Sequence, residues 1–174
     1  RHPPAYAVTL TRLSKHTPWH TDMGARRQRL AGQRGQRFLI HAPPQFGKSV
    51  ILSQRFPAWY LGIHPLARVK LACYNISHAE KFGGVVREIV QSPEYAEMFP
   101  GEQYQVPHPS SQQHWSNKGR TALRDSQPSF KALGLATGLG GQGAERLLVA
   151  DPDAAPRDAF RAAKTPARPM FWDP

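Results

Sequence analysis

The chain has 174 residues, of which 40% are hydrophobic and 20% are charged, and this suits one globular domain with no apolar run long enough to span a membrane. Its 23 Lys and Arg residues exceed its 12 Asp and Glu residues, and the net charge of +11 favours a polyanion such as nucleic acid as partner, with an ordinary solvated basic surface as the alternative. A single cysteine, Cys73, and an N-terminus unlike a signal peptide lead us to expect a protein of the reducing cytoplasm.

The N-terminal residues are predicted to approach the domain from outside. Residues 1–20 are rich in Pro and Thr, with scattered apolar positions, and residues 20–37 are basic and compatible with a helix. The arginines of this second stretch form either a patch that faces phosphates or an ordinary solvated helix face. We expect residues 1–36 to pack on a core domain formed by residues 37–155.

A phosphate-binding loop is predicted at residues 42–49. The apolar residues 38–40 predict a short buried strand, and an apolar, helix-compatible segment begins at Gly47-Lys48-Ser49. The spacing G-x-x-x-x-G-K-[ST] is kept except that Ala42 stands at the first glycine. In such a loop the backbone N–H groups face the anion, Lys48 reaches the outer phosphates and Ser49 coordinates Mg²⁺. A plain structural turn is the alternative. The nucleotide-contacting residues would be Ala42, Pro43, Pro44, Gln45, Phe46, Gly47, Lys48 and Ser49.

Helices and strands alternate after this loop. A helix is expected from Val50, with Pro57 either kinking it or starting a new one and Gly62 as its stop. Residues 69–74 predict the second strand, and residues 77–90 a helix behind the cap-like Asn75.

The second half is less regular. Residues 100–128 predict a long loop or a short hairpin around Trp115, and residues 130–136 a strand. A glycine-rich loop follows at 138–143, and residues 147–151 form a buried strand that ends in an acid. Strands that alternate with helices indicate an α/β domain with a mostly parallel sheet. Residues 156–174 are expected to be a weakly organised tail.

Asp151 closes an apolar run, as in a Walker B strand. Such a strand carries its carboxylate to the C-terminal edge of the sheet, where it binds Mg²⁺ directly or through water. An ordinary turn Asp after a buried strand is the alternative. Hydrolysis also needs a carboxylate that orients the attacking water. Here Pro152 follows Asp151, and Asp153 is the one nearby acid that could act as this second group.

Several stretches together carry a resemblance. They are His16 to His20, the loop Ala42-Pro43-Pro44-Gln45-Phe46-Gly47-Lys48-Ser49, the segment Arg55 to Gly62 with His64-Pro65 and the residues at 72–75 and 79–80, then Phe99-Pro100 and the segment Gly134 to Pro152. They resemble the ATPase domain of the large terminase subunit, the DNA-packaging motor of tailed bacteriophages, over residues 16–155. The loop is close to that family's P-P-R-x-G-K-S form.

The resemblance implies a P-loop NTPase fold of the additional-strand (ASCE) type, with helices on a mostly parallel sheet. It implies ATP and Mg²⁺ as ligands, catalysis through Lys48, Asp151 and Asp153, and Mg²⁺ binding through Ser49 and Asp151. Its partners would be double-stranded DNA, a portal protein and a small terminase subunit. The active form would be a homo-oligomeric ring on the procapsid in the host cytoplasm, with no membrane contact. An arginine supplied in trans would be Arg146, Arg120 or Arg124, each of which has a plain surface role as the alternative.

Two departures from the family pattern bear on activity. Gln45 and Gln142 replace arginines of the family, and an ungapped comparison places Ala150 on the first acid of the family's D-D pair and Asp151 on the second. One acid is therefore missing unless Asp153 substitutes, so we expect nucleotide binding to survive better than hydrolysis. The family's C-terminal nuclease domain is expected to be absent from these 174 residues, which would then be a fragment or a short relative.

Three hypotheses follow. The first is an ATP-hydrolysing motor domain that translocates double-stranded DNA into a procapsid. The second is a hydrolysis-impaired, nucleotide-binding module that contacts DNA and derives from such a motor. The third is a basic DNA-binding fragment with no nucleotide role.

Overall fold

The computed structural model describes residues 37, 39–41, 43, 45–107, 110–123, 127–135 and 143–150. The predictions for the N-terminal segment 1–36, for most of the glycine-rich loop and for the tail 156–174 lie outside these residues.

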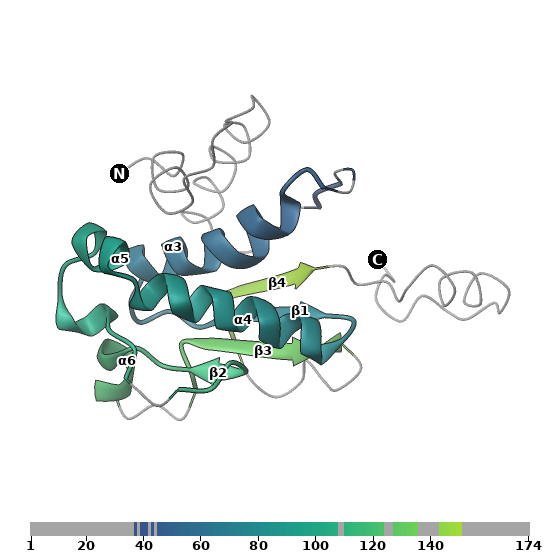
Figure 1. The fold of residues 1–174 in the computed structure, drawn as a ribbon. Helices are drawn as coiled ribbons and strands as arrows, with labels where there is room; N and C mark the ends of the chain where they lie inside the picture. The colour runs from purple at the N-terminus through teal and green to yellow at the C-terminus, as the bar shows by residue number, and fades with distance from the viewer. Residues whose placement is uncertain are drawn as a thin grey trace, which may run out of the picture.

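The described strands form one mixed, mostly parallel sheet (Figure 1). The strands are β1 (Val69–Cys73), β2 (His114–Trp115), β3 (Phe130–Gly134) and β4 (Arg146–Ala150), in the order β2-β3-β1-β4. β1 pairs in parallel with both β3 and β4, and β2 pairs antiparallel with β3. The α/β class and the strands predicted near 69–74 and 130–136 are therefore confirmed. A strand is also found over residues 146–150, but it is not buried as predicted, because Leu147 and Val149 are 50% and 49% exposed.

Helices η1, α3 and α4 form a layer on one face of this sheet (Figure 1). The described helices are η1 (Val50–Arg55), α3 (Phe56–Ile63), α4 (Ile76–Gln91), α5 (Pro93–Met98), η2 (Glu102–Tyr104) and α6 (Lys118–Ala122). η1 is a π-helical segment that continues directly into α3, where Pro57 is tolerated in the first turn. Within the described ranges no helix is both long and apolar enough to cross a bilayer.

α4 has the cap and the apolar face that the sequence predicts. Asn75 has extended backbone geometry, and its side chain accepts a hydrogen bond of 2.9 Å from the Ser77 backbone N–H. Ala79 and Val86 are fully buried on the face turned to the sheet. The helix therefore forms because a good cap precedes residues whose apolar positions recur at helical spacing.

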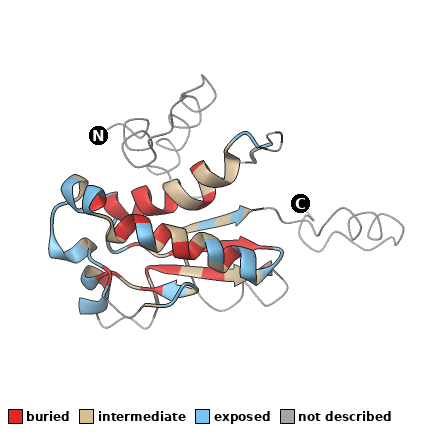
Figure 2. Ribbon diagram, viewed as in Figure 1, coloured by how far each residue is buried: buried red, intermediate tan, exposed pale blue. Residues whose placement is uncertain are grey.

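The hydrophobic core lies between α3, α4 and the sheet, where Figure 2 shows the buried residues concentrated. Alternate residues of the strands enter this core, among them Val69 and Leu71 of β1 and Phe130 of β3. Trp115 of β2 stacks on Phe130, with ring centroids 5.4 Å apart. The predicted irregular stretch 100–128 is therefore anchored to the core through a two-residue strand.

The strand predicted at residues 38–40 is not found. Residues 39–41 belong to no strand, and the side chain of Leu39 is 78% exposed. An apolar run becomes a buried strand only where it can pair with a neighbouring strand. In the described part of the chain β4 pairs with β1 alone, so residues 39–41 are not paired with it.

Gly62 also differs from its prediction as a helix stop. The helix continues to Ile63, and Gly62 is buried inside it. The ring of Phe99 packs so closely on Gly62 that a Cβ at this position would collide with it. Glycine is needed here for close packing rather than for a turn.

Candidate functional site

Two residues of the predicted phosphate loop have left-handed backbone geometry. The φ angle is 65° at Gln45 and 73° at Gly47. Glycine adopts such angles without strain, whereas a glutamine there costs on the order of 1 kcal/mol. Strained positions of this kind concentrate in ligand-binding loops. The loop therefore has the backbone reversal that lets successive N–H groups face an anion.

The helix that follows the loop begins at Lys48. The Ile51 backbone N–H donates to the Gly47 carbonyl at 3.0 Å, so intrahelical bonding starts at the last loop residue. The Ser49 side chain makes no capping hydrogen bond, and the first turn of η1 contains no acidic residue. Helix N-termini carry partial positive charge and attract phosphate groups. A lysine, a serine hydroxyl and a helix N-terminus form a donor set that fits a phosphate.

The position of the loop in the fold also suits a ligand site. The parallel strands run in the same direction, and the loop lies at the end of the helix layer that is nearer to their carboxyl ends (Figure 1). η1, which follows the loop, contacts β4. In open α/β sheets, ligands bind in the crevice at the carboxyl ends of the strands.

The predicted acids cannot be placed beside this loop. Asp151 and Asp153 lie outside the described residues, and the part of the chain that is described contains no group of three His, Cys, Asp or Glu residues that could hold a metal. Ser49 is thus the one predicted Mg²⁺ ligand with a described position. Ala150, the last residue of β4, packs against the core. The position that the family pattern gives to its first acid therefore faces the helix layer and carries a methyl group.

Two of the candidate trans arginines, Arg120 and Arg146, make contacts within the fold. Arg120 is buried, and its side chain donates to the carbonyl oxygens of Gln127, at 2.8 Å, and of Leu66. The guanidinium of Arg146, at the amino end of β4, lies 4.8 Å from the centre of the Tyr60 ring. These contacts favour a structural role for both residues, so a role in trans stays a prediction. Arg124 lies outside the described residues.

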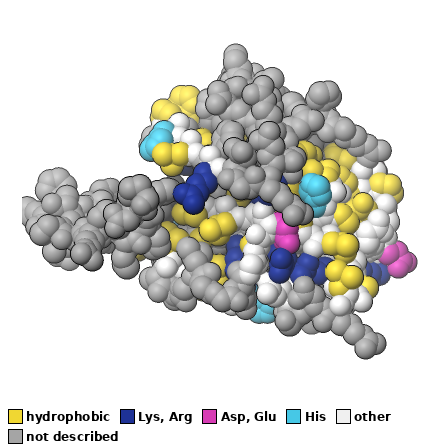
Figure 3. Space-filling model, turned by 180° about the vertical axis from the view of Figure 1, so that it is seen from behind, with side chains coloured by type: hydrophobic (Ala, Val, Ile, Leu, Met, Phe, Trp, Pro, Cys, Tyr) yellow, Lys and Arg dark blue, Asp and Glu magenta, His cyan; other side chains and the backbone are white. Residues whose placement is uncertain are grey.

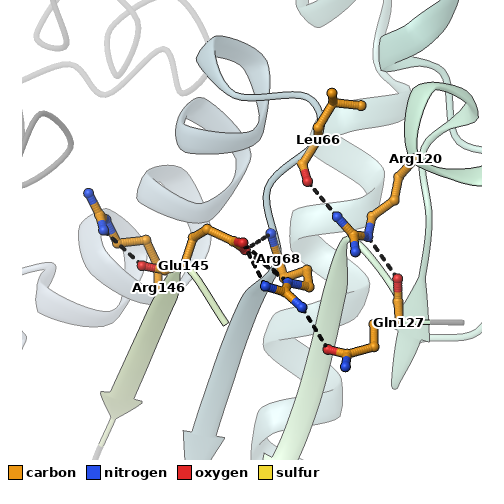
Figure 4. A network of polar contacts seen from close by, with 6 residues as sticks. All are labelled: Leu66, Arg68, Arg120, Gln127, Glu145 and Arg146. Carbon is orange, nitrogen blue, oxygen red and sulfur yellow. Dashed lines mark hydrogen bonds and ion pairs between the residues drawn. The ribbon is translucent and has the colours of Figure 1, made fainter. Parts of the chain in front are cut away.

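A polar network that the sequence did not reveal ties β1 to β4 at their amino ends (Figure 4). The Arg68 side chain donates to both Glu145 carboxylate oxygens, with an Nη2 to Oε1 distance of 2.8 Å, and to Gln127 Oε1 at 3.3 Å. The Arg68 backbone N–H also donates to Glu145 Oε2 at 2.6 Å. Residues 68 and 145 are too far apart in sequence for any local pattern to indicate their pairing.

This network changes the pKa of Glu145. Desolvation on its own would raise that pKa, but the hydrogen bonds from the Arg68 side chain and backbone outweigh it and lower the pKa to about 2. The carboxylate is therefore charged at neutral pH. The Glu145 carboxylate holds the amino ends of β1 and β4 together and so stabilises the sheet. The loop lies nearer to the opposite, carboxyl ends of these strands (Figure 1).

Basic side chains lie on the sheet face that α3 and α4 leave uncovered. Lys70 of β1 and Lys131 of β3 are register partners on that face. Burial lowers the pKa of Lys70, and the nearby charges of Lys131 and Arg68 lower it further. The view from behind shows Lys and Arg side chains gathered beside hydrophobic ones (Figure 3).

No protein-family model matches the chain, and no curated protein matches it.

Proposed function

We propose that the chain is an Mg²⁺-ATP-binding P-loop ATPase domain of a DNA-packaging motor that resembles the large terminase subunit. The observation that carries the proposal is the loop at 45–49. Its two left-handed residues lead into a helix that begins with Lys48 and Ser49 near the carboxyl ends of a parallel sheet. The strained Gln45, three residues before Lys48, supports this proposal because strained backbone positions cluster at ligand-binding sites.

Each residue would contribute a separate interaction. Lys48 would neutralise the β- and γ-phosphates, and the loop N–H groups would bind phosphate oxygens. Ser49 and Asp151 would hold Mg²⁺. When bound there, Mg²⁺ would neutralise negative charge that develops on the phosphates. Asp153 would orient the attacking water if it takes the place of the missing acid.

Double-stranded DNA is the proposed partner on the basis of charge and resemblance. A net charge of +11 supports phosphate contacts whose affinity falls steeply with salt. Lys131 places part of this charge on the sheet face opposite α4, whereas its register partner Lys70 is buried. Assembly as a ring on a portal, and docking of a small terminase subunit, come from the resemblance alone.

The motor function is tested by DNA-stimulated phosphate release. We expect the purified chain to release phosphate from ATP faster when double-stranded DNA is added, and Lys48→Ala to return the rate to background. Lys81→Ala removes an exposed lysine from α4 and serves as the matched control that keeps the rate. Equal background rates for the unchanged chain and Lys48→Ala would rule out the motor.

A hydrolysis-impaired, nucleotide-binding module is the second candidate, and Ala150 favours it. The side chain at the carboxyl end of β4 that packs towards the helices is a methyl group, which can neither hold a metal nor orient water. This candidate predicts Mg²⁺-dependent nucleotide binding that is lost in Lys48→Ala, with no phosphate release above background.

A further inference from the structure

η1 connects the loop at residues 45–49 to the core through a rare helical register. The Ile51 backbone N–H donates to the Gly47 carbonyl, four residues back, as in an ordinary α-helix. The Phe56 backbone N–H donates instead to the Ile51 carbonyl, five residues back, which is the π-helical pattern. Such segments are uncommon and occur frequently at functional sites. The turn between Ile51 and Phe56 therefore contains one residue more than an α-helical turn.

This register determines which side chain of η1 is buried. Ile51 and Phe56 are each 3% exposed, whereas Leu52 is only partly buried. In an α-helix, residues on one face are three or four positions apart, so Leu52 rather than Ile51 would lie in line with Phe56. Leucine and isoleucine gain similar free energy on burial, so burial alone does not select the π register.

Pro57 directly follows this segment, in the first turn of α3, and is fully buried. In an α-helical register its ring would clash with the Ser53 carbonyl, four residues back, and it has no N–H to donate to that carbonyl. A turn that contains an extra residue displaces the carbonyl from the ring. The proline therefore penalises the α register and leaves the π register as the better one.

We propose that Pro57 is a positioning residue for the nucleotide site, because it holds η1 in the π register and this register sets the direction of Lys48 and Ser49. The proposal rests on the proposed function. α3 is anchored in the core through Phe56 and Trp59, so a change of register moves the loop side of the helix. In the α register each residue before Phe56 would shift by one place, a rotation of about 100°. Ser49 would then stand where Lys48 now stands.

Substitution of Pro57 tests this role. We expect Pro57→Ala to weaken Mg²⁺-dependent binding of a fluorescent ATP analogue about tenfold or more, because alanine permits the α register and misplaces Lys48. Removal of Gln54 from the same variant shortens the segment by one residue, so the α register then points Lys48 correctly. Binding should return to within a factor of about three of the unchanged chain. Val86→Ala removes a buried side chain from α4 and serves as the control for lost packing, with affinity kept.

The hydrogen bonds of η1 give a second readout that needs no ligand. Scalar couplings across hydrogen bonds, measured by NMR, should join the Phe56 amide nitrogen to the Ile51 carbonyl carbon in the unchanged chain and to the Leu52 carbonyl carbon in Pro57→Ala. Coupling to Leu52 in the unchanged chain would overturn the positioning role. Normal binding by Pro57→Ala, or no binding by the double variant, would also overturn it. If the unchanged chain binds no analogue, the proposed function fails, whereas the couplings still decide whether Pro57 sets the register.

Discussion

Gln45 is the residue whose backbone geometry most clearly separates a ligand loop from an ordinary turn. A φ of 65° is strained for glutamine and relaxed for glycine. The family's arginine would meet the same strain, so the left-handed geometry belongs to the loop rather than to the departure from the family pattern.

Gln45→Gly should therefore stabilise the fold by about 0.5–1 kcal/mol, while Gln45→Val should destabilise it by about 1 kcal/mol or more, because a β-branched residue suits this geometry least. Urea unfolding of the two variants measures both effects. If glycine and valine change the free energy of unfolding alike, the left-handed geometry of Gln45 is wrong.

Glu145 determines part of the acid sensitivity of the fold. Its pKa is lowered to about 2 in the folded chain, against 4.5 for the unperturbed group. A lowered folded pKa contributes stability that is complete above about pH 4.5 and is lost as the pH falls towards 2.

Glu145→Gln should lower the free energy of unfolding at pH 7 by about 1 kcal/mol, a modest value because the side chain is 38% exposed and its ion pair is screened by solvent. The difference from the unchanged chain should shrink between pH 4.5 and pH 3. Urea unfolding across this range measures it, with the exposed Glu88→Gln on α4 as control. A difference that stays constant with pH would contradict the assigned pKa.

Substitutions of Ala150 test the predicted catalytic acids rather than the stability of the fold. If Asp151 occupies the second position of the family's acid pair, Ala150→Asp restores the first and should raise phosphate release on the order of tenfold or more. Ala150→Asn introduces a side chain of nearly the same size as aspartate but without its charge, so it should not raise the rate of phosphate release. An unchanged rate in a folded Ala150→Asp protein would contradict this register.

At the scale of elements, α4 packs closely enough on its neighbours to distinguish adjacent glycines. A Cβ on Gly83 would collide with the Gln112 carbonyl oxygen and lie 2.9 Å from the Phe130 ring, whereas a Cβ on Gly84 would make an ordinary contact at 3.5 Å with the Gln112 side chain.

Gly83→Ala should therefore destabilise the chain by about 1–3 kcal/mol through overpacking. Gly84→Ala should be neutral or stabilise it by up to about 1 kcal/mol, because alanine is the better helix former. Thermal or urea unfolding of the pair measures both. Equal effects would show that α4 does not approach β2 and β3 as closely as described.

Elements with local signals were predictable from the sequence, and elements defined by distant partners were not. The cap at Asn75 and the apolar period of α4 are local, and so is the apolar run of β1. β2 forms only because its two residues pair with β3. The Arg68–Glu145 ion pair likewise joins segments that are 77 residues apart in the sequence. The strand predicted at residues 38–40 was wrong for the described residues 39 and 40, because a local apolar run does not specify a partner strand.

For the whole molecule, the sequence predicted the α/β class and the mostly parallel sheet. The left-handed geometry of Gln45 could not be predicted, since glutamine has no preference for it. The acids of the predicted site lie outside the described residues, so the account of the site depends on the loop and the helix that follows it.

The most direct test of that account is the equilibrium binding of a fluorescent ATP analogue. We predict saturable binding that requires Mg²⁺, is lost in Lys48→Ala and is retained in Lys81→Ala. Absence of saturable binding, or equal binding by Lys48→Ala, would contradict a nucleotide site at residues 42–49 and leave a basic DNA-binding domain as the better description.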